Sequence, residues 1–254
     1  MFNKWKVITL ITCCCFPLQS FADELISLKA GYQLLSPEGS IAGTVVGDTE
    51  EFDLDKDLEL DDSEDFTGEI ALQWGRSRLS FNYLPINFSG TGTLTQDVVF
   101  NGETYNVNNT VKSDLSIDLY DFGYTYYVLN FDDLPTRFQL GLELAVKVAD
   151  VDVSVTNLTG TIFTESASVT APIPTIGART RIALADFLGI SGRIGYLEFD
   201  DNHFLDAEAQ VEFSPLPMVG FYAGYRIFDL KVDEDDVFVE TEFSGPFGGL
   251  MVRF

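Results

Sequence analysis

The sequence predicts an all-β protein, a closed antiparallel transmembrane β-barrel of about ten strands. Three observations lead to this prediction. Apolar and polar residues alternate through most of the chain, with the polar positions often charged. The segments that join the alternating stretches are short and long in turn. The chain also ends on an aromatic residue, Phe254, while the alternation is still running. In a closed barrel the last strand pairs with the first, so a chain can end inside the sheet.

The first 22 residues have the features of a secretory signal peptide. Lys4 and Lys6 precede an apolar run, and the small residues of Ser20-Phe21-Ala22 form a cleavage motif. The apolar run covers about ten residues, too few to span a bilayer as a helix. Residues 1–22 are therefore predicted to be removed, leaving a barrel domain over 23–254. The alternative is a lipoprotein acylated at Cys13.

The composition of the remaining chain excludes several classes of protein. All three cysteines lie before residue 22, so the mature chain is not a disulfide-stabilised scaffold. Loss of Lys4 and Lys6 changes the formal net charge from −25 to −27. A surface this acidic argues against nucleic acid as a partner.

The alternation is clearest over residues 138–149. Every second residue from Phe138 to Val148 is apolar, whereas the positions between them include Glu143 and Lys147. Segments beginning near residues 26, 66, 176 and 205 repeat the pattern. An apolar outer face with a polar inner face is what a barrel in lipid requires. A secreted β-sandwich would explain the alternation but not the charged inner faces.

The expected strands cover 24–35, 64–74, 76–92, 111–128, 136–154, 168–185, 189–199, 204–213, 218–231 and 236–254. The long connections, 36–63, 93–110 and 155–167, are acidic or polar and are expected outside the cell, with both termini in the periplasm. Eight or twelve strands are the alternatives, because "EEFDLDKDLELDD" has a strand-like period and can join the sheet.

Charged residues on the predicted inner faces form the main candidate site. Opposite charges inside a narrow barrel are expected to pair, which fills the lumen with side chains. The alternative is a narrow gated pore whose selectivity these charges set. The predicted lumen residues are Lys29, Glu69, Glu143, Lys147, Arg179, Arg181, Arg193, Glu208, Glu212 and Arg226.

Aromatic residues near the predicted strand ends are expected to form girdles at the membrane interfaces. They are Trp74, Tyr120, Phe122, Tyr124, Tyr126 and Phe131.

The acidic segment after the first strand has a spacing similar to that of a calcium-binding loop. Leu58 occupies the position where such a loop needs glycine, and an acidic strand face explains the same spacing. Weak binding of a divalent cation such as calcium, bridging to lipopolysaccharide, is one hypothesis, and no other cofactor is expected. The candidate ligands are Asp53, Asp55, Asp57, Glu59, Asp61 and Glu64.

Catalysis is not expected. His203 is the only histidine, and it lies beside Asp200 and Asp201 in a predicted outer loop. Outer-membrane proteases of the omptin type also have ten strands and an Asp–His pair, which makes an Asp/His hydrolase the remote alternative. The chain contains no G-x-S-x-G element, phosphate-binding glycine loop or Cys/His zinc set.

Two short motifs carry a family resemblance. Phe247-Gly248-Gly249 before the terminal Phe254, together with "FDLDKDLELDD", resembles a family of small Gram-negative outer-membrane β-barrels named for its terminal Gly-Gly. The resemblance implies a barrel in the outer membrane of a Gram-negative bacterium and supplies no catalytic residues. Leu250, Val252 and Phe254 are similar to the C-terminal signal through which the barrel-insertion machinery recognises such proteins.

The function predicted from the sequence is a non-enzymatic structural or surface-interaction barrel with a filled lumen. A small passive pore is the second hypothesis and the Asp/His hydrolase the third. The expected partners are outer-membrane lipid and lipopolysaccharide.

Overall fold

The computed structural model describes residues 25–45, 48–53, 59–95, 97–131, 137–200, 202–234 and 237–254. The predicted signal peptide, its cleavage site and Cys13 lie outside this part of the chain. Among the described residues, no helix is long and apolar enough to cross a membrane.

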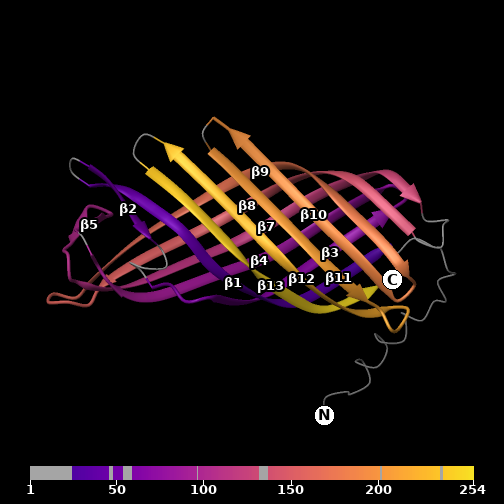
Figure 1. The fold of residues 1–254 in the computed structure, drawn as a ribbon, viewed down its shortest axis with the longest axis horizontal. Helices are drawn as coiled ribbons and strands as arrows, with labels where there is room; N and C mark the ends of the chain where they lie inside the picture. The colour runs from indigo at the N-terminus through magenta and orange to yellow at the C-terminus, as the bar shows by residue number, and fades with distance from the viewer. Residues whose placement is uncertain are drawn as a thin grey trace, which may run out of the picture.

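Ten antiparallel strands close into a barrel. Each pairs with the next in the chain, and β13 returns to pair with β1, for example Leu28 opposite Val252. The closed sheet satisfies the backbone groups that a membrane core would leave unpaired. Figure 1 shows the strongly tilted strands. The barrel strands are β1 (Ile26–Val45), β3 (Ser63–Trp74), β4 (Ser77–Thr93), β7 (Thr110–Phe131), β8 (Arg137–Asn157), β9 (Phe163–Ala185), β10 (Leu188–Phe199), β11 (Asn202–Phe213), β12 (Val219–Glu234) and β13 (Val237–Arg253).

Three further strands lie outside the barrel wall in the described residues. β2 (Asp48–Asp53) pairs with the far end of β1, so part of the predicted loop 36–63 is strand. β5 (Val98–Phe100) and β6 (Glu103–Tyr105) form a small hairpin whose Asn101-Gly102 turn has positive φ at both residues. That conformation is the usual two-residue hairpin turn. β2 adds to the sheet without entering the closed ring, so the alternatives of eight and twelve strands were wrong.

The barrel strands match the ten predicted ones, but several extend further from the membrane. β8 and β9 run to Asn157 and from Phe163, so the predicted loop 155–167 was too long. β10 and β11 have only 12 residues each. The β10–β11 hairpin therefore ends well before the β8–β9 hairpin does (Figure 1).

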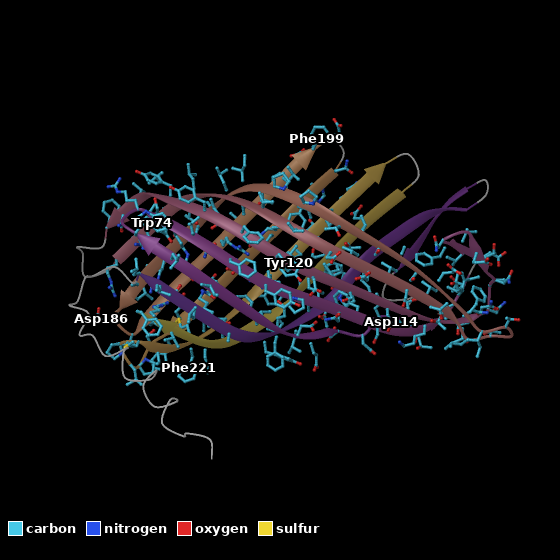
Figure 2. The ribbon with its side chains drawn as sticks, turned by 180° about the vertical axis from the view of Figure 1, so that it is seen from behind. Trp74, Asp114, Tyr120, Asp186, Phe199 and Phe221 are labelled. Atoms are coloured by element: carbon cyan, nitrogen blue, oxygen red, sulfur yellow. The ribbon has the colours of Figure 1, made fainter. Side chains whose placement is uncertain are left out.

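An apolar belt surrounds the outer surface. On β8 the outward side chains are apolar from Phe138 to Val148, and Leu142 is 62% exposed. This eleven-residue stretch agrees with the about 9–11 residues that a tilted strand needs to cross a bilayer. Trp74 lies on the belt near one end of the barrel, whereas Asp114 lies well toward the opposite end (Figure 2).

Beyond the belt the polarity of the two faces of the wall reverses. After Val148 the outward residues of β8 become Asp150 and Asp152, while Val151 and Val153 turn inward. The reversal recurs on β4 after Tyr83 and on β7 before Tyr120. The part of the wall beyond the belt therefore has a polar outside and an apolar inside, as a water-soluble sheet has.

Candidate functional site

The centre of the lumen holds a buried ion cluster of two cations and two carboxylates. Lys147 Nζ lies 2.8 Å from Asp121 Oδ2 and 2.6 Å from Asp206 Oδ2. Arg193 reaches the same two oxygens, with Nη1 2.5 Å from Asp121 and Nη2 2.8 Å from Asp206. All four side chains are at most 2% exposed. Each charge is thus balanced by near neighbours, as burial requires.

Two further carboxylates, those of Glu143 and Glu208, extend the cluster around Arg193. Glu143 accepts a hydrogen bond from Arg179 Nε at 2.8 Å and lies 3.8 Å from Arg193. Glu208 pairs with Arg226 and lies 3.7 Å from Arg193 Nε. Arg226 also stacks on the ring of Phe247, 4.9 Å from its centroid.

A second group of charges lies at the end of the lumen nearer the C-terminus. Lys29 lies between Glu69 at 3.7 Å and Glu212 at 3.8 Å. Arg78 donates to Glu69 at 2.9 Å. Glu212 also pairs with Arg253 and, at 3.3 Å, with Arg181. A cavity of about 30 Å³ lies among these side chains.

All ten predicted lumen residues lie in this network, but the sequence interpretation left out Asp121, Asp206, Arg78 and Arg253. Asp206 and Arg253 already lay on polar faces of alternating segments. Asp121 lies between Tyr120 and Phe122, in a segment that was interpreted only through its aromatic face, as part of a girdle.

A cluster of buried apolar side chains, here called the apolar plug, lies in the lumen beyond the charge network. Its buried residues come from seven of the barrel strands and from Leu60, which precedes β3. Phe88 of β4 and Phe243 of β13 meet across the lumen with ring centroids 5.0 Å apart. The plug consists of Leu35, Leu60, Leu84, Ile86, Phe88, Leu119, Ala149, Phe204, Phe228 and Phe243.

A smaller apolar cluster fills the space beneath the β5–β6 hairpin. Tyr105 is completely buried there. Its ring contacts that of Phe163 in a tilted arrangement, with centroids 5.0 Å apart, and its hydroxyl donates to the carbonyl oxygen of Val155 at 3.0 Å. Burial raises the pKa of the Tyr105 hydroxyl, with the nearby Glu165 carboxylate adding to the rise. The hairpin is thus anchored to the β8–β9 wall.

The acidic segment proposed for a cation is only partly described. Asp55 and Asp57 lie outside the described residues, as does the side chain of Asp53. Glu59 has a positive φ, and the backbone N–H of Asp61 bonds to the carbonyl of Ser89. In the described part of the chain, no three acidic, histidine or cysteine side chains gather as metal ligands would. Glu64 instead accepts the hydroxyl of Tyr32 at 2.9 Å.

His203 lies on the outer surface, away from the lumen. Its Nε2 is 3.4 Å from Asp229 Oδ1 on the neighbouring strand, and its ring stacks on Tyr196. Asp229 is a partner that the sequence did not indicate. Asp200 occupies a turn with positive φ, and Asp201 lies outside the described residues.

The predicted girdle residues divide between the two rims and the middle of the belt. Trp74 and Phe131 lie at the strand ends nearer the C-terminus, with Tyr124 and Tyr126 nearby on β7. Phe122 lies midway along that strand, and Tyr120 lies at the opposite rim. Tyr120 stacks on Tyr83 there, 5.3 Å between centroids. At that rim, tyrosine hydroxyls donate to carboxylates just beyond the belt: Tyr32 to Glu64 (2.9 Å), Tyr83 to Asp118 (2.6 Å) and Tyr196 to Glu198 (3.0 Å).

The C-terminal residues belong to the belt. Leu250 and Phe254 are about half exposed on the part of the belt nearer the chain's C-terminus, and the backbone N–H of Phe254 donates to the carbonyl oxygen of Ile26. The Gly248-Gly249 pair lies within the β1–β13 seam, where a Cβ on Gly249 would lie 2.2 Å from the carbonyl oxygen of Ala30. The two strands thus approach too closely for a side chain at that position.

Comparison with known proteins identifies the fold. No protein-family model matches the chain, and no curated protein matches its sequence. The outer membrane protease OmpT of Escherichia coli matches 94% of this chain and 99% of its own, with a TM-score of 0.62 and 10% identity. Neisserial surface protein A matches 90% of this chain and 97% of its own, with a TM-score of 0.34 and 13% identity. The fold is that of the Gram-negative outer-membrane β-barrels.

Proposed function

We propose that the protein is an integral outer-membrane barrel with a closed lumen that acts as a structural or surface-interaction protein. The observation that supports the proposal is that two layers of buried side chains lie in the lumen. The ion network lies within the belt, and the apolar plug lies beyond it. A solute would have to displace both layers to pass.

The location in the outer membrane is part of the proposal. The apolar belt has the height of a bilayer, and aromatic residues line both of its rims. The wall beyond the belt is acidic outside, and the remaining surface available to partners lies there. We expect Leu250, Val252 and Phe254 to be the segment that the barrel-insertion machinery reads, and outer-membrane lipid with its lipopolysaccharide to be the neighbours of the belt.

Single-channel recording of the refolded protein in planar bilayers tests the closed lumen. We expect no discrete openings from the unmodified protein or from Arg181→Ala. The double variant Phe88→Ala with Phe243→Ala removes the aromatic contact of the plug and serves as the comparison. Frequent openings of the unmodified protein, with a selectivity that Arg181→Ala shifts, would instead establish the passive pore.

The hydrolase stays the remote alternative. His203 faces outward beside Asp229, at the rim of the belt, where a substrate would have to approach past the lipid headgroups. If the purified protein hydrolyses peptides and His203→Ala abolishes this activity, the hydrolase replaces the proposed function.

A further inference from the structure

Within the described residues, β9 has a long edge that is not paired with another strand. β9 pairs with β8 from Phe163 to Ala183. Its other edge pairs with β10 only from Ile176 onward, and in that register Phe199, the last residue of β10, falls beside Ile173. Residues 163–172 of β9 therefore face a gap above the short β10–β11 hairpin. Phe199 marks the tip of that hairpin in Figure 2.

The prolines of β9 establish which backbone groups face the gap. Pro172 and Pro174 lie opposite Val148 and Val146 of β8 in an unbroken ladder. Proline has no N–H to give to that ladder, so these positions direct their backbone groups away from β8. The even-numbered residues of β9 thus present their N–H and C=O groups to the gap. The carbonyl of Ser166 accordingly accepts a side-chain hydrogen bond from Asn101, at 3.4 Å.

The protection of this edge is incomplete. Pro172 and Pro174 remove two donors directly above the β9–β10 pairing, a common device against unwanted strand addition. Thr164, Ser166, Ser168 and Thr170 keep their donors, and residues 166–170 are all exposed. Asn101 occupies a single carbonyl of this stretch. An exposed run of this kind is a template for another strand.

We propose that residues 164–170 of β9 bind an extended peptide segment of another protein by β-strand addition. The proposal rests on the proposed function, because it requires that this edge lies outside the cell. Backbone hydrogen bonds to the even-numbered residues hold the peptide, and the side chains beside them select it.

The two faces of the wall specify the chemistry of the peptide. On the inner face its side chains lie beside Ala167 and Val169, and Val169 is 59% exposed. On the outer face they lie beside hydroxyl side chains, with Asp150 and Asp152 in the next strand. The peptide that fits alternates small apolar residues with lysine or arginine.

A second copy of this chain is a poorer occupant. Two copies inserted in the same direction have their β9 strands running in the same direction. Antiparallel pairing of two such edges would require one copy to be inverted in the membrane. The acidic outer face also attracts a basic peptide, whereas it would repel the equally acidic face of a second copy.

Fluorescence anisotropy with a labelled synthetic peptide tests the proposal. The probe is a peptide of about nine residues that alternates valine and lysine, matched to one of the same sequence with N-methyl groups at alternate residues. The full mature chain, folded in detergent micelles, is expected to bind the first probe saturably and the N-methylated one not at all.

Three variants separate backbone pairing from other binding. Ser168→Pro removes an edge donor as Pro172 does, so it leaves the β8 ladder intact and should weaken binding about fivefold to tenfold. Ser168→Ala keeps the donor and should bind like the unmodified protein. Pro172→Thr adds a donor and should bind more tightly.

Equal binding by Ser168→Pro and Ser168→Ala would overturn the proposal, as would equal binding of the two peptides. Sedimentation that shows dimers sensitive to Ser168→Pro would assign the edge to a second copy instead. If the barrel does not conduct and does not bind the peptide, this inference alone is overturned. If the barrel conducts, the proposed function is overturned.

Discussion

Removal of the Lys147 charge should destabilise the barrel far more than removal of an exposed one. Lys147 is 1% exposed and contacts two carboxylates, those of Asp121 and Asp206, at 2.8 and 2.6 Å. At an effective dielectric constant of about 20, each contact contributes roughly 6 kcal/mol of Coulomb attraction. Most of this is offset by the cost of desolvating the ions. Loss of one partner from a buried ion network costs about 3–5 kcal/mol in net unfolding free energy, and we expect Lys147→Met to fall in that range.

The chain provides a matched control on its outer surface. Lys231 lies 3.7 Å from Glu240, and the two side chains are 31% and 55% exposed. Solvent screens such a pair, so Lys231→Met should cost less than about 1 kcal/mol. A double variant, Lys147→Met with Asp206→Asn, removes one charge of each sign and should be more stable than Lys147→Met alone.

Urea unfolding of the protein in lipid vesicles measures these differences. Trp74 is the only tryptophan after residue 22, so its fluorescence follows the barrel itself. The reasoning is refuted if Lys147→Met and Lys231→Met have equal unfolding free energies, or if the double variant is the least stable of the three.

Four other changes test separate parts of the structure. Phe88→Ala should lower the unfolding free energy by about 3–5 kcal/mol and admit water-soluble quenchers to the plug, and an unchanged midpoint in urea would contradict the packing. Gly31→Ala should reduce folding yield, because the new Cβ would lie 2.2 Å from the Tyr222 hydroxyl oxygen; a normal yield by heat-modifiability would show that the ring relocates freely. Phe254→Ser should slow assembly in cells, seen as periplasmic accumulation of the exported chain, whereas normal kinetics would remove its role as a signal. Tyr105→Phe loses one buried hydrogen bond, at a cost of about 1 kcal/mol, and should increase hydrogen exchange in the β5–β6 hairpin alone.

The barrel itself could be predicted because lipid imposes a strict rule on each strand. Over residues 138–148 every outward position is apolar and the inward ones are polar or small, so the period and the faces are both visible in the sequence. The inner charges followed from the same alternation. Their pairing did not, because the choice of Asp121 and Asp206 as shared partners depends on which strands face each other across the lumen.

The far part of β1 was harder to predict. The expected strand stops at 35, because Ser36-Pro37-Glu38-Gly39 has the composition of a turn, whereas β1 continues to Val45 and pairs with both β13 and β2. On β8 the expected strand 136–154 already includes Val151 and Val153, but the reversal of its two faces after Val148 was not predicted. Likewise, Leu60 lies in an acidic segment that suggested a cation site, whereas its side chain belongs to the plug.

The depth of introduced tryptophans in lipid vesicles tests the account most directly. In a Trp74→Phe background, Leu144→Trp lies on the middle of the belt and Asp152→Trp lies beyond its rim. Lipids brominated in the middle of their acyl chains should strongly quench the tryptophan at 144 and leave the one at 152 unaffected. Equal quenching at both positions would contradict the reversal of the pattern between Val148 and Asp150, and with it the placement of the plug outside the membrane.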